Sequence, residues 1–190
     1  FAIGAGAGFA VGSRTLDKRS LRGSDIVGFT AYCDRNLPET VVAHLQALIE
    51  AFEAIVEDHQ MEKIKTIGDA FMATSGLLRP VEAPLLTAVR CGLEMSRIAG
   101  TMEPNWEVRI GLHFGPVVAG IVGKQQFLFD VWGDTVNIAA RLVEHGTPGA
   151  VAMTAAAWEE IKEECDSRAL GVIDIKGKGQ LDVVEAFAIR

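Results

Sequence analysis

Two long stretches of the chain carry apolar residues at helical spacing. In the first, apolar positions recur every three or four residues, so they fall on one face of a helix. They are Val41, Val42, Leu45, Leu48, Ile49, Phe52, Ile55 and Val56. Asn36 supplies an N-cap and Pro38 an early proline, which predicts that the helix begins there. The second stretch, 83–98, is apolar on most faces, which predicts a well-buried helix.

Strand patterns lie before, between and after these helices. Residues 62–68 and 70–75 read as two strands joined tightly at a Gly-Asp pair, which predicts a hairpin. Regular alternation of apolar and other residues marks the clearest strand. Its apolar positions are Trp106, Val108, Ile110, Leu112 and Phe114. We expect a turn at Gly115-Pro116 and a further strand at 117–122.

The remaining elements are shorter. We expect strands at 127–131, 150–154, 171–175 and 183–189, a short helix at 135–144 capped by Asp134 and ended by Gly146, and a helix near 155–164. The order βαββαβ, followed by additional C-terminal α/β elements, predicts an α+β fold with a ferredoxin-like core and helices packed on one face of the sheet. We place one domain at 21–190 and treat 1–20 as a linker or the stub of an upstream region.

Composition narrows the function classes. The 190 residues suffice for one hydrophobic core without disulfides. A net charge of −7 argues against a protein that coats duplex nucleic acid, so no nucleic-acid partner is expected. Cys33, Cys91 and Cys165 show no metal-binding spacing, which favours reduced thiols and a cytoplasmic location. The apolar run 1–12 is shorter than the roughly 20 residues of a membrane-spanning helix.

Two acidic residues are candidate metal ligands. Asp25 and Asp69 each lie at the end of an expected strand near a glycine, where a carboxylate can point out from the rim of a sheet. Mg²⁺ and Mn²⁺ take oxygen ligands, and two such ions can clamp the attacking and leaving oxygens of a phosphoryl displacement. Taken alone, each aspartate is more simply explained as a turn or cap residue.

Four motifs in a fixed order favour metal ligands over turn or cap residues as the interpretation of these aspartates. They read SDIVGFT at 24–30, KIKTIGDAFMA at 63–73, FDVWGDTVNIAARL at 129–142 and KGKG at 176–179. Together they resemble the signature blocks of the class III adenylyl and guanylyl cyclase catalytic domains, and the resemblance implies the class III nucleotidyl cyclase fold. It implies that Asp25 and Asp69 bind two divalent cations, Mg²⁺ or Mn²⁺, with the Ile26 carbonyl as an additional ligand.

The resemblance also implies a catalytic pair and a phosphate-binding lysine. Asn137 and Arg141, four residues apart on the predicted short helix, match residues that orient the ribose and stabilise charge on the α-phosphate. Arginine suits this role because its planar fork stays cationic and meets two phosphate oxygens. Lys176 matches the lysine that neutralises the terminal phosphates, with Lys178 as the alternative.

Lys65 and Asp130 match the family's purine-reading pair, and their chemistry can also be argued directly. Adenine offers an acceptor at N1 and an amino donor at N6, which a lysine ammonium and an aspartate carboxylate complement. Guanine reverses both groups, and each buried polar group left unpaired costs about 1–3 kcal/mol. The pair therefore favours ATP over GTP.

The resemblance implies an adenylyl cyclase that converts ATP to 3′,5′-cyclic AMP and pyrophosphate in signal transduction. In this family one domain supplies the aspartates and another the purine pair, asparagine and arginine. Because this chain carries both sets, a homodimer with two composite sites is implied. The alternatives are a guanylyl cyclase and a catalytically silent dimerising or nucleotide-sensing domain. A regulatory or membrane domain ahead of Phe1, which would tether the cyclase to the membrane, is left open.

Two departures from the family pattern stand out. Residues 14–24 are polar where the family has an apolar first strand, which leaves the placement of Asp25 open. Phe129 stands where a tyrosine is common, which removes only a hydroxyl group.

Overall fold

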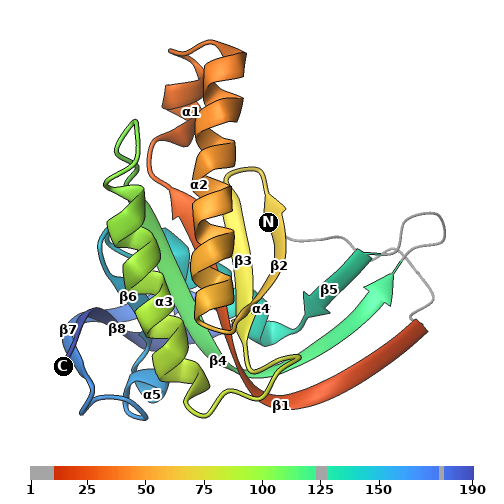
Figure 1. Ribbon diagram of the computed structural model, residues 1–190. Helices are drawn as coiled ribbons and strands as arrows, with labels where there is room; N and C mark the ends of the chain where they lie inside the picture. Colours follow the sequence, from red (N-terminus) through yellow and green to blue (C-terminus); the bar gives the residue numbers. More distant parts are fainter. Residues whose placement is uncertain (1–10, 123–127, 176–177) are drawn as a thin grey trace.

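An eight-stranded β-sheet with helices on its two faces forms the molecule (Figure 1). The computed structural model describes residues 11–122, 128–175 and 178–190, so Lys176 lies outside the described residues. The elements are β1 (Val11–Ile26), α1 (Phe29–Cys33), α2 (Pro38–Asp58), β2 (Glu62–Ile67), β3 (Ala70–Ser75), α3 (Pro84–Ala99), β4 (Val108–Val122), β5 (Leu128–Trp132), α4 (Asp134–His145), β6 (Val151–Thr154), α5 (Ala155–Trp158), β7 (Cys165–Ile175) and β8 (Gly179–Ile189).

The sheet confirms the predicted α+β class and its βαββαβ core. Strands lie in the order β2-β3-β1-β4-β6-β8-β7, and β5 pairs with β4 beside this path. Strand β1 is antiparallel to β3 and β4, and β6 runs parallel to β4. The core order β2-β3-β1-β4 is therefore set by two helical connections, α2 and α3, that carry the chain between non-adjacent strands.

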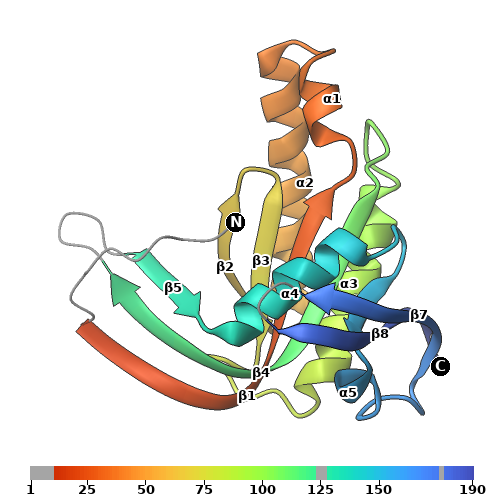
Figure 2. The same ribbon diagram turned by 180° about the vertical axis from the view of Figure 1, so that it is seen from behind.

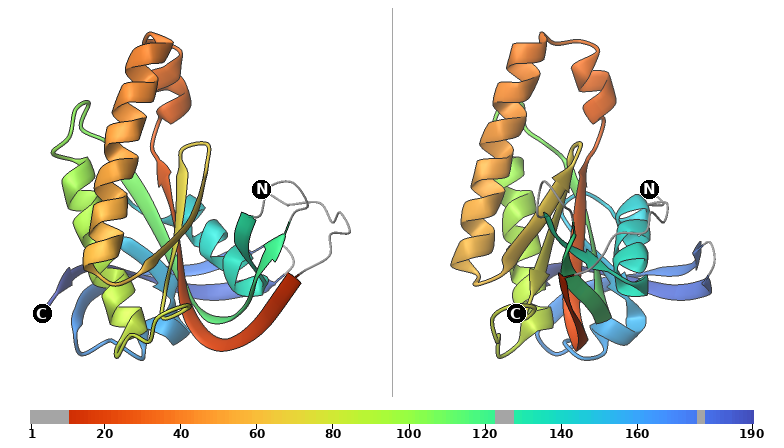
Figure 3. Two further views of the ribbon diagram at one scale, coloured as in Figure 1. Left: turned by 45° about the vertical axis from the view of Figure 1, so that its right-hand side comes forward. Right: turned by 90° about the vertical axis from the view of Figure 1, so that its right-hand side faces the viewer.

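Helices pack on both faces, so the expectation that they share one face was wrong. Figure 3 shows α2 and α3 on one side of the sheet and α4 on the other. The side chains of Ile110 and Leu112 belong to the core beneath α2 and α3. Gly111, between them, faces α4 so closely that a Cβ there would lie 2.4 Å from the Ala139 oxygen and the Val143 nitrogen. Because glycine has no apolar side chain, the hydrophobic pattern of this strand did not predict that its second face contacts a helix.

Strand β4 continues through the turn expected at Gly115-Pro116. In its pairing with β1, Gly115 lies opposite Arg19 and Val117 opposite Leu16, and the register shifts between those two partners. Pro116 thus falls at a bulge, where a residue without an N–H is tolerated within a strand. Its carbonyl accepts a hydrogen bond of 2.6 Å from the Thr135 hydroxyl, which ties β4 to the start of α4.

Strand β1 starts at Val11, inside the segment that sequence analysis assigned to a linker or stub. Its backbone pairs with β4 from Val11 opposite Ile121 to Ile26 opposite Val108. The polar stretch ahead of Asp25 is therefore part of a strand. Residues 20–24 pair with both β3 and β4, and the residues before them pair with β4 alone, which apolar periodicity could not reveal.

The C-terminal third differs from expectation in the lengths of its elements. The helix expected near 155–164 is limited to Ala155–Trp158 and is followed by turns. The two late strands are longer than expected and form a hairpin that pairs Cys165 with Ile189 and Ile175 with Gly179. Figure 2 shows this hairpin beside α4 at the edge of the sheet.

Candidate active site

Asp25 and Asp69 lie side by side at one rim of the sheet. Asp25 is the penultimate residue of β1, and Asp69 occupies the β2–β3 turn, where Gly68 has a positive φ of 61°. Because β1 pairs with β3, with Ser24 opposite Phe71, the turn is brought next to the end of β1. Burial raises the pKa of the Asp69 carboxyl, and its hydrogen bond with Asp25 and the charge of Asp25 raise it further, against hydrogen bonds from backbone amides including that of Ile26.

This pair of carboxylates fits a divalent cation of the Mg²⁺ type. Such an ion is commonly held by one or two carboxylates and completed by substrate phosphates and water. Two adjacent carboxylates that repel each other supply such a partial oxygen set. Within the described part of the chain there is no cluster of three or more His, Cys, Asp or Glu suited to a metal. Ile26 is buried, with 4% of its surface exposed, and a ligand role for its carbonyl stays a prediction.

Arg109 is a site residue that sequence reasoning missed. It lies on β4 directly opposite Asp25, and its Nη2 donates to Asp25 Oδ2 at 2.6 Å. The alternation of Val108 and Ile110 into the core places Arg109 on the other face of β4. That much was readable from the pattern, but its partner depends on strand register, which the sequence does not display.

Lys65 and Asp130 are brought together from strands that are far apart in sequence. Lys65 lies on β2 and Asp130 on β5, and their Nζ and Oδ2 atoms are 2.5 Å apart. Their side chains keep only 24% and 19% of their surface exposed. The backbone amide of Val131 also donates to Asp130 Oδ1 at 2.8 Å, which orients the carboxylate. A hydrogen-bond donor, the Lys65 ammonium, thus lies next to an acceptor, the Asp130 carboxylate.

Asn137 and Arg141 lie on α4, on the opposite face of the sheet from α2 and α3 (Figure 2). Asn137 is exposed, and Arg141 Nη1 contacts both carboxylate oxygens of Glu144, at 2.8 and 3.1 Å. Lys178 in the β7–β8 turn pairs with Asp134 at the start of α4, at 2.8 Å. This contact places Lys178, the alternative phosphate-binding lysine, beside the start of α4.

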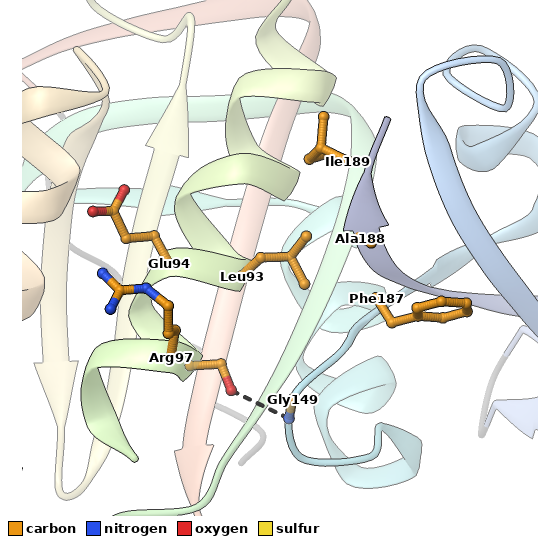
Figure 4. Close-up of a pocket in the computed structure, with 8 residues that line it drawn as sticks. Leu93, Glu94, Arg97, Gly149, Phe187, Ala188 and Ile189 are labelled. Atoms are coloured by element: carbon orange, nitrogen blue, oxygen red, sulfur yellow. Dashed lines mark hydrogen bonds between the residues drawn. The ribbon is translucent and has the colours of Figure 1, made fainter. Parts of the chain in front are cut away.

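A surface pocket of about 460 Å³ lies away from these residues, between α3 and β8. Figure 4 shows Leu93, Phe187 and Ile189 as its apolar lining, with the Gly149 amide donating to the Ser96 hydroxyl at its edge. None of the predicted site residues lines this pocket. Within one chain the candidate residues are therefore distributed over the sheet and α4 and do not enclose this cavity.

Comparison with known families identifies the type of domain. The family model described as the adenylate and guanylate cyclase catalytic domain matches residues 12–188. The chain belongs to this family. The predicted class III cyclase resemblance is thus confirmed, and the domain is a cyclase catalytic domain of adenylyl or guanylyl type.

Curated relatives of this cyclase domain carry both activities in their names. The chain is 37% identical over 167 residues to an adenylate cyclase of Mycobacterium bovis, covering 86% of this chain and 38% of that protein. It is 35% identical over 166 residues to guanylate cyclase soluble subunit beta-2 of Rattus norvegicus, covering 83% of this chain and 24% of that protein. The cyclase domain thus spans well under half of the length of these relatives.

Among solved structures, the cyclase domain resembles the guanylate cyclase domain of RhGC from Catenaria anguillulae in complex with GTP. The TM-score is 0.89 at 27% identity, covering 93% of this chain and all of that one, 100%. Over the described ranges, no helix is long and apolar enough to cross a membrane.

Proposed function

We propose that this cyclase domain is an adenylyl cyclase that converts ATP to 3′,5′-cyclic AMP and pyrophosphate. The observation that carries the proposal is the Lys65–Asp130 pair, with its 2.5 Å separation and low exposure. Adenine presents an acceptor and an amino donor that match a lysine and an aspartate, whereas guanine presents the reverse. The name of the mycobacterial relative, adenylate cyclase, agrees with this assignment.

The remaining residues take complementary roles in the same reaction. Asp25 and Asp69, with the Ile26 carbonyl, would hold two Mg²⁺ or Mn²⁺ ions. Bound there, the ions would make the ribose 3′-hydroxyl more acidic and offset the charge of the polyphosphate. Asn137 would orient the ribose, and Arg141 would exchange its contact with Glu144 for the α-phosphate. Lys176, outside the described residues, would meet the terminal phosphates.

We further propose that two copies of the chain share each site. Throughout the described residues, no hydrogen bond or ion pair joins Asn137 or Arg141 directly to Asp25 or Asp69. A second chain would bring its α4 to the aspartates of the first, and the twofold arrangement would yield two equivalent sites. Each site would then use the two aspartates of one chain. The other chain would supply its purine-reading pair, Lys65 and Asp130, together with Asn137 and Arg141.

An assay with Mn²⁺-ATP and Mn²⁺-GTP tests the reaction and its substrate. We expect cyclic AMP as the main product, with ATP preferred by at least about tenfold because guanine would leave two polar groups mismatched. Preferential formation of cyclic GMP would replace the proposal with the guanylyl cyclase alternative. No product from either nucleotide at any protein concentration would leave the silent dimerising or nucleotide-sensing alternative.

A mixing experiment tests the shared site. Asp69→Ala and Arg141→Ala should each be inactive alone, because each homodimer lacks one half of both sites. Mixed, they should regain activity, since a mixed dimer holds one complete site. Activity of the mixture no higher than that of either variant alone would contradict the composite arrangement.

A further inference from the structure

The Arg109 guanidinium makes two hydrogen bonds, one from each of its terminal nitrogens. Nη2 donates to Asp25 Oδ2 at 2.6 Å, and Nη1 makes a longer hydrogen bond of 3.4 Å to the backbone carbonyl of Glu144. Its Nε is buried and has no hydrogen-bond partner among the described residues. The contacts of this side chain thus run through its two terminal nitrogens, one to the end of β1 and one to the end of α4.

The hydrogen bond from Arg109 toward α4 is accepted by Glu144, which also forms an ion pair with Arg141. Glu144 accepts from Arg109 with its carbonyl and from Arg141 Nη1 with its carboxylate, at 2.8 and 3.1 Å. Gly111 lets α4 lie directly on β4, two residues along the same strand face from Arg109. The last turn of α4 is therefore placed by close backbone packing at Gly111 and by the guanidinium at its end.

We propose that Arg109 is a positioning residue that ties Asp25 to the end of α4 within one chain and so couples the two half-sites that this chain contributes. The inference rests on the proposed function, in which Asp25 serves one composite site of the homodimer and Arg141 serves the other. A shift at Asp25 on nucleotide or cation binding would be passed through Arg109 and Glu144 to Arg141. The two sites of the dimer would then communicate through a single side chain in each protomer.

Stability alone does not account for this arrangement. The Arg109 and Asp25 side chains are 30% and 33% exposed, and partly exposed ion pairs contribute little to the free energy of unfolding. A simple electrostatic role is also insufficient, because a positive charge beside Asp25 opposes cation binding. Removing the charge alone would strengthen cation binding, whereas loss of positioning lowers turnover.

Mixing experiments test the contact of Arg109 with Asp25 and its contact with Glu144 separately. A chain that carries both Arg109→Met and Arg141→Ala, mixed with Asp69→Ala, forms mixed dimers with one working site, which depends on Asp25 of the Arg109→Met chain. A chain that carries both Arg109→Met and Asp69→Ala, mixed with Arg141→Ala, forms mixed dimers with one working site, which depends on α4 of the Arg109→Met chain. Compared with Asp69→Ala mixed with Arg141→Ala, we expect both mixtures to lose about tenfold or more in turnover, because small misplacements of reacting groups cost that much. Loss in only one mixture, or in neither, would overturn the coupling.

A matched control is Arg190→Met. Arg190 forms an ion pair with Asp166 at 2.7 Å, close to the Arg109–Asp25 distance, at the end of the chain and away from the candidate site. It should leave activity unchanged in both mixtures. Arg109→Lys keeps the charge but lacks the fork, so it should remain impaired in at least one mixture. Full activity of Arg109→Lys in both mixtures would overturn a positioning role that needs both hydrogen bonds of the guanidinium.

Hydrogen exchange tests the positioning without using activity. In Arg109→Met, amides in the last turn of α4 and at the end of β1 should exchange about tenfold faster, while Arg190→Met leaves them unchanged. Unchanged exchange at both places in Arg109→Met would overturn the proposal. If Asp69→Ala and Arg141→Ala fail to complement each other, the shared site of the proposed function is contradicted, and the exchange result still decides whether Arg109 positions both elements.

Discussion

The Asp69 carboxyl is held next to Asp25 in an environment that disfavours its charge. Burial and the neighbouring carboxylate raise the pKa of Asp69 above its ordinary value of 3.8. Between the ordinary and the raised pKa the folded protein binds more protons than the unfolded one, so its stability falls as the pH rises through that range. The charged pair is therefore a local cost that a bound cation would relieve.

Asp69→Asn should raise the melting midpoint at pH 7 in the absence of divalent cations, because it removes a partly buried negative charge next to Asp25. The gain should disappear as the pH falls below 3.8, where the carboxyl is protonated in both states. Thermal unfolding followed at several pH values with EDTA measures this difference. Added Mn²⁺ should stabilise the unsubstituted protein more than the variant. A lower midpoint for Asp69→Asn at pH 7 would contradict the expected repulsion.

Lys65→Ala should reduce the preference for ATP over GTP by about tenfold or more, because it removes the donor that faces adenine N1. The measurement is kcat/KM for both nucleotides. Lys63→Ala is the matched control, since Lys63 lies on the same strand but pairs with Glu53. An equal loss of selectivity in both variants would show that base recognition does not depend on Lys65.

At the residue scale, motifs in the sequence indicated candidate residues that lie close together in the structure, but not how they are connected to the rest of the fold. Asp25 with Asp69, and Lys65 with Asp130, were chosen by motif, and the fold brings the members of each pair together. Arg109 was missed because its significance lies in being opposite Asp25 across two strands. Such a partner becomes visible only when the register of β1 and β4 is known.

At the element scale, the helices followed from periodicity and the long strands did not. Helix α2 begins at the predicted Pro38, and α3 lies within one residue of the predicted range 83–98, because both carry apolar residues at helical spacing. Strand β1 has a polar sequence that hides its central place, and a bulge at Pro116 lets β4 continue where a turn was expected. Backbone pairing decided both cases.

Gly111→Ala should displace α4 from the sheet, because the added Cβ would lie 2.4 Å from backbone atoms that cannot rotate away. Overpacking of this kind costs about 1–3 kcal/mol in the free energy of unfolding, measured by urea denaturation. We also expect lower cyclase activity, since Asn137 and Arg141 move with the helix. Gly100→Ala is the control, because its Cβ would meet atoms no nearer than 3.6 Å. Equal stability of the two variants would contradict close packing at Gly111.

At the scale of the whole molecule, the proposed site requires two chains, so specific activity should depend on concentration. On dilution to one tenth of the dimer dissociation constant, mass action leaves about one chain in seven paired, and specific activity should fall about sevenfold. Activity and sedimentation measured across one dilution series test this together. Constant specific activity in samples that sediment as monomers would contradict the shared site.

Exposed apolar residues on β4 and β5 offer a surface for the partner chain. Val118 and Leu128 are 38% and 64% exposed on the same face of this projecting pair of strands, since Leu128 lies opposite Val122. Leu128→Asp should shift the dilution curve to higher concentrations because it places a charge on this surface. Leu78→Asp, at a residue 62% exposed beyond β3, is the control. Equal shifts would show that pairing does not use β5.

The long pairing of β1 with β4 has a practical consequence for truncation. Residues 11–20 cover one side of the distal half of β4, with Val11 opposite Ile121 and Leu16 opposite Val117. A fragment that begins at Leu21 would leave that side as an open strand edge, ready to recruit the same edge of another molecule. Such a fragment would lose the backbone hydrogen bonds of residues 11–20 to β4, so it should unfold at a lower temperature than a fragment that begins at or before Val11.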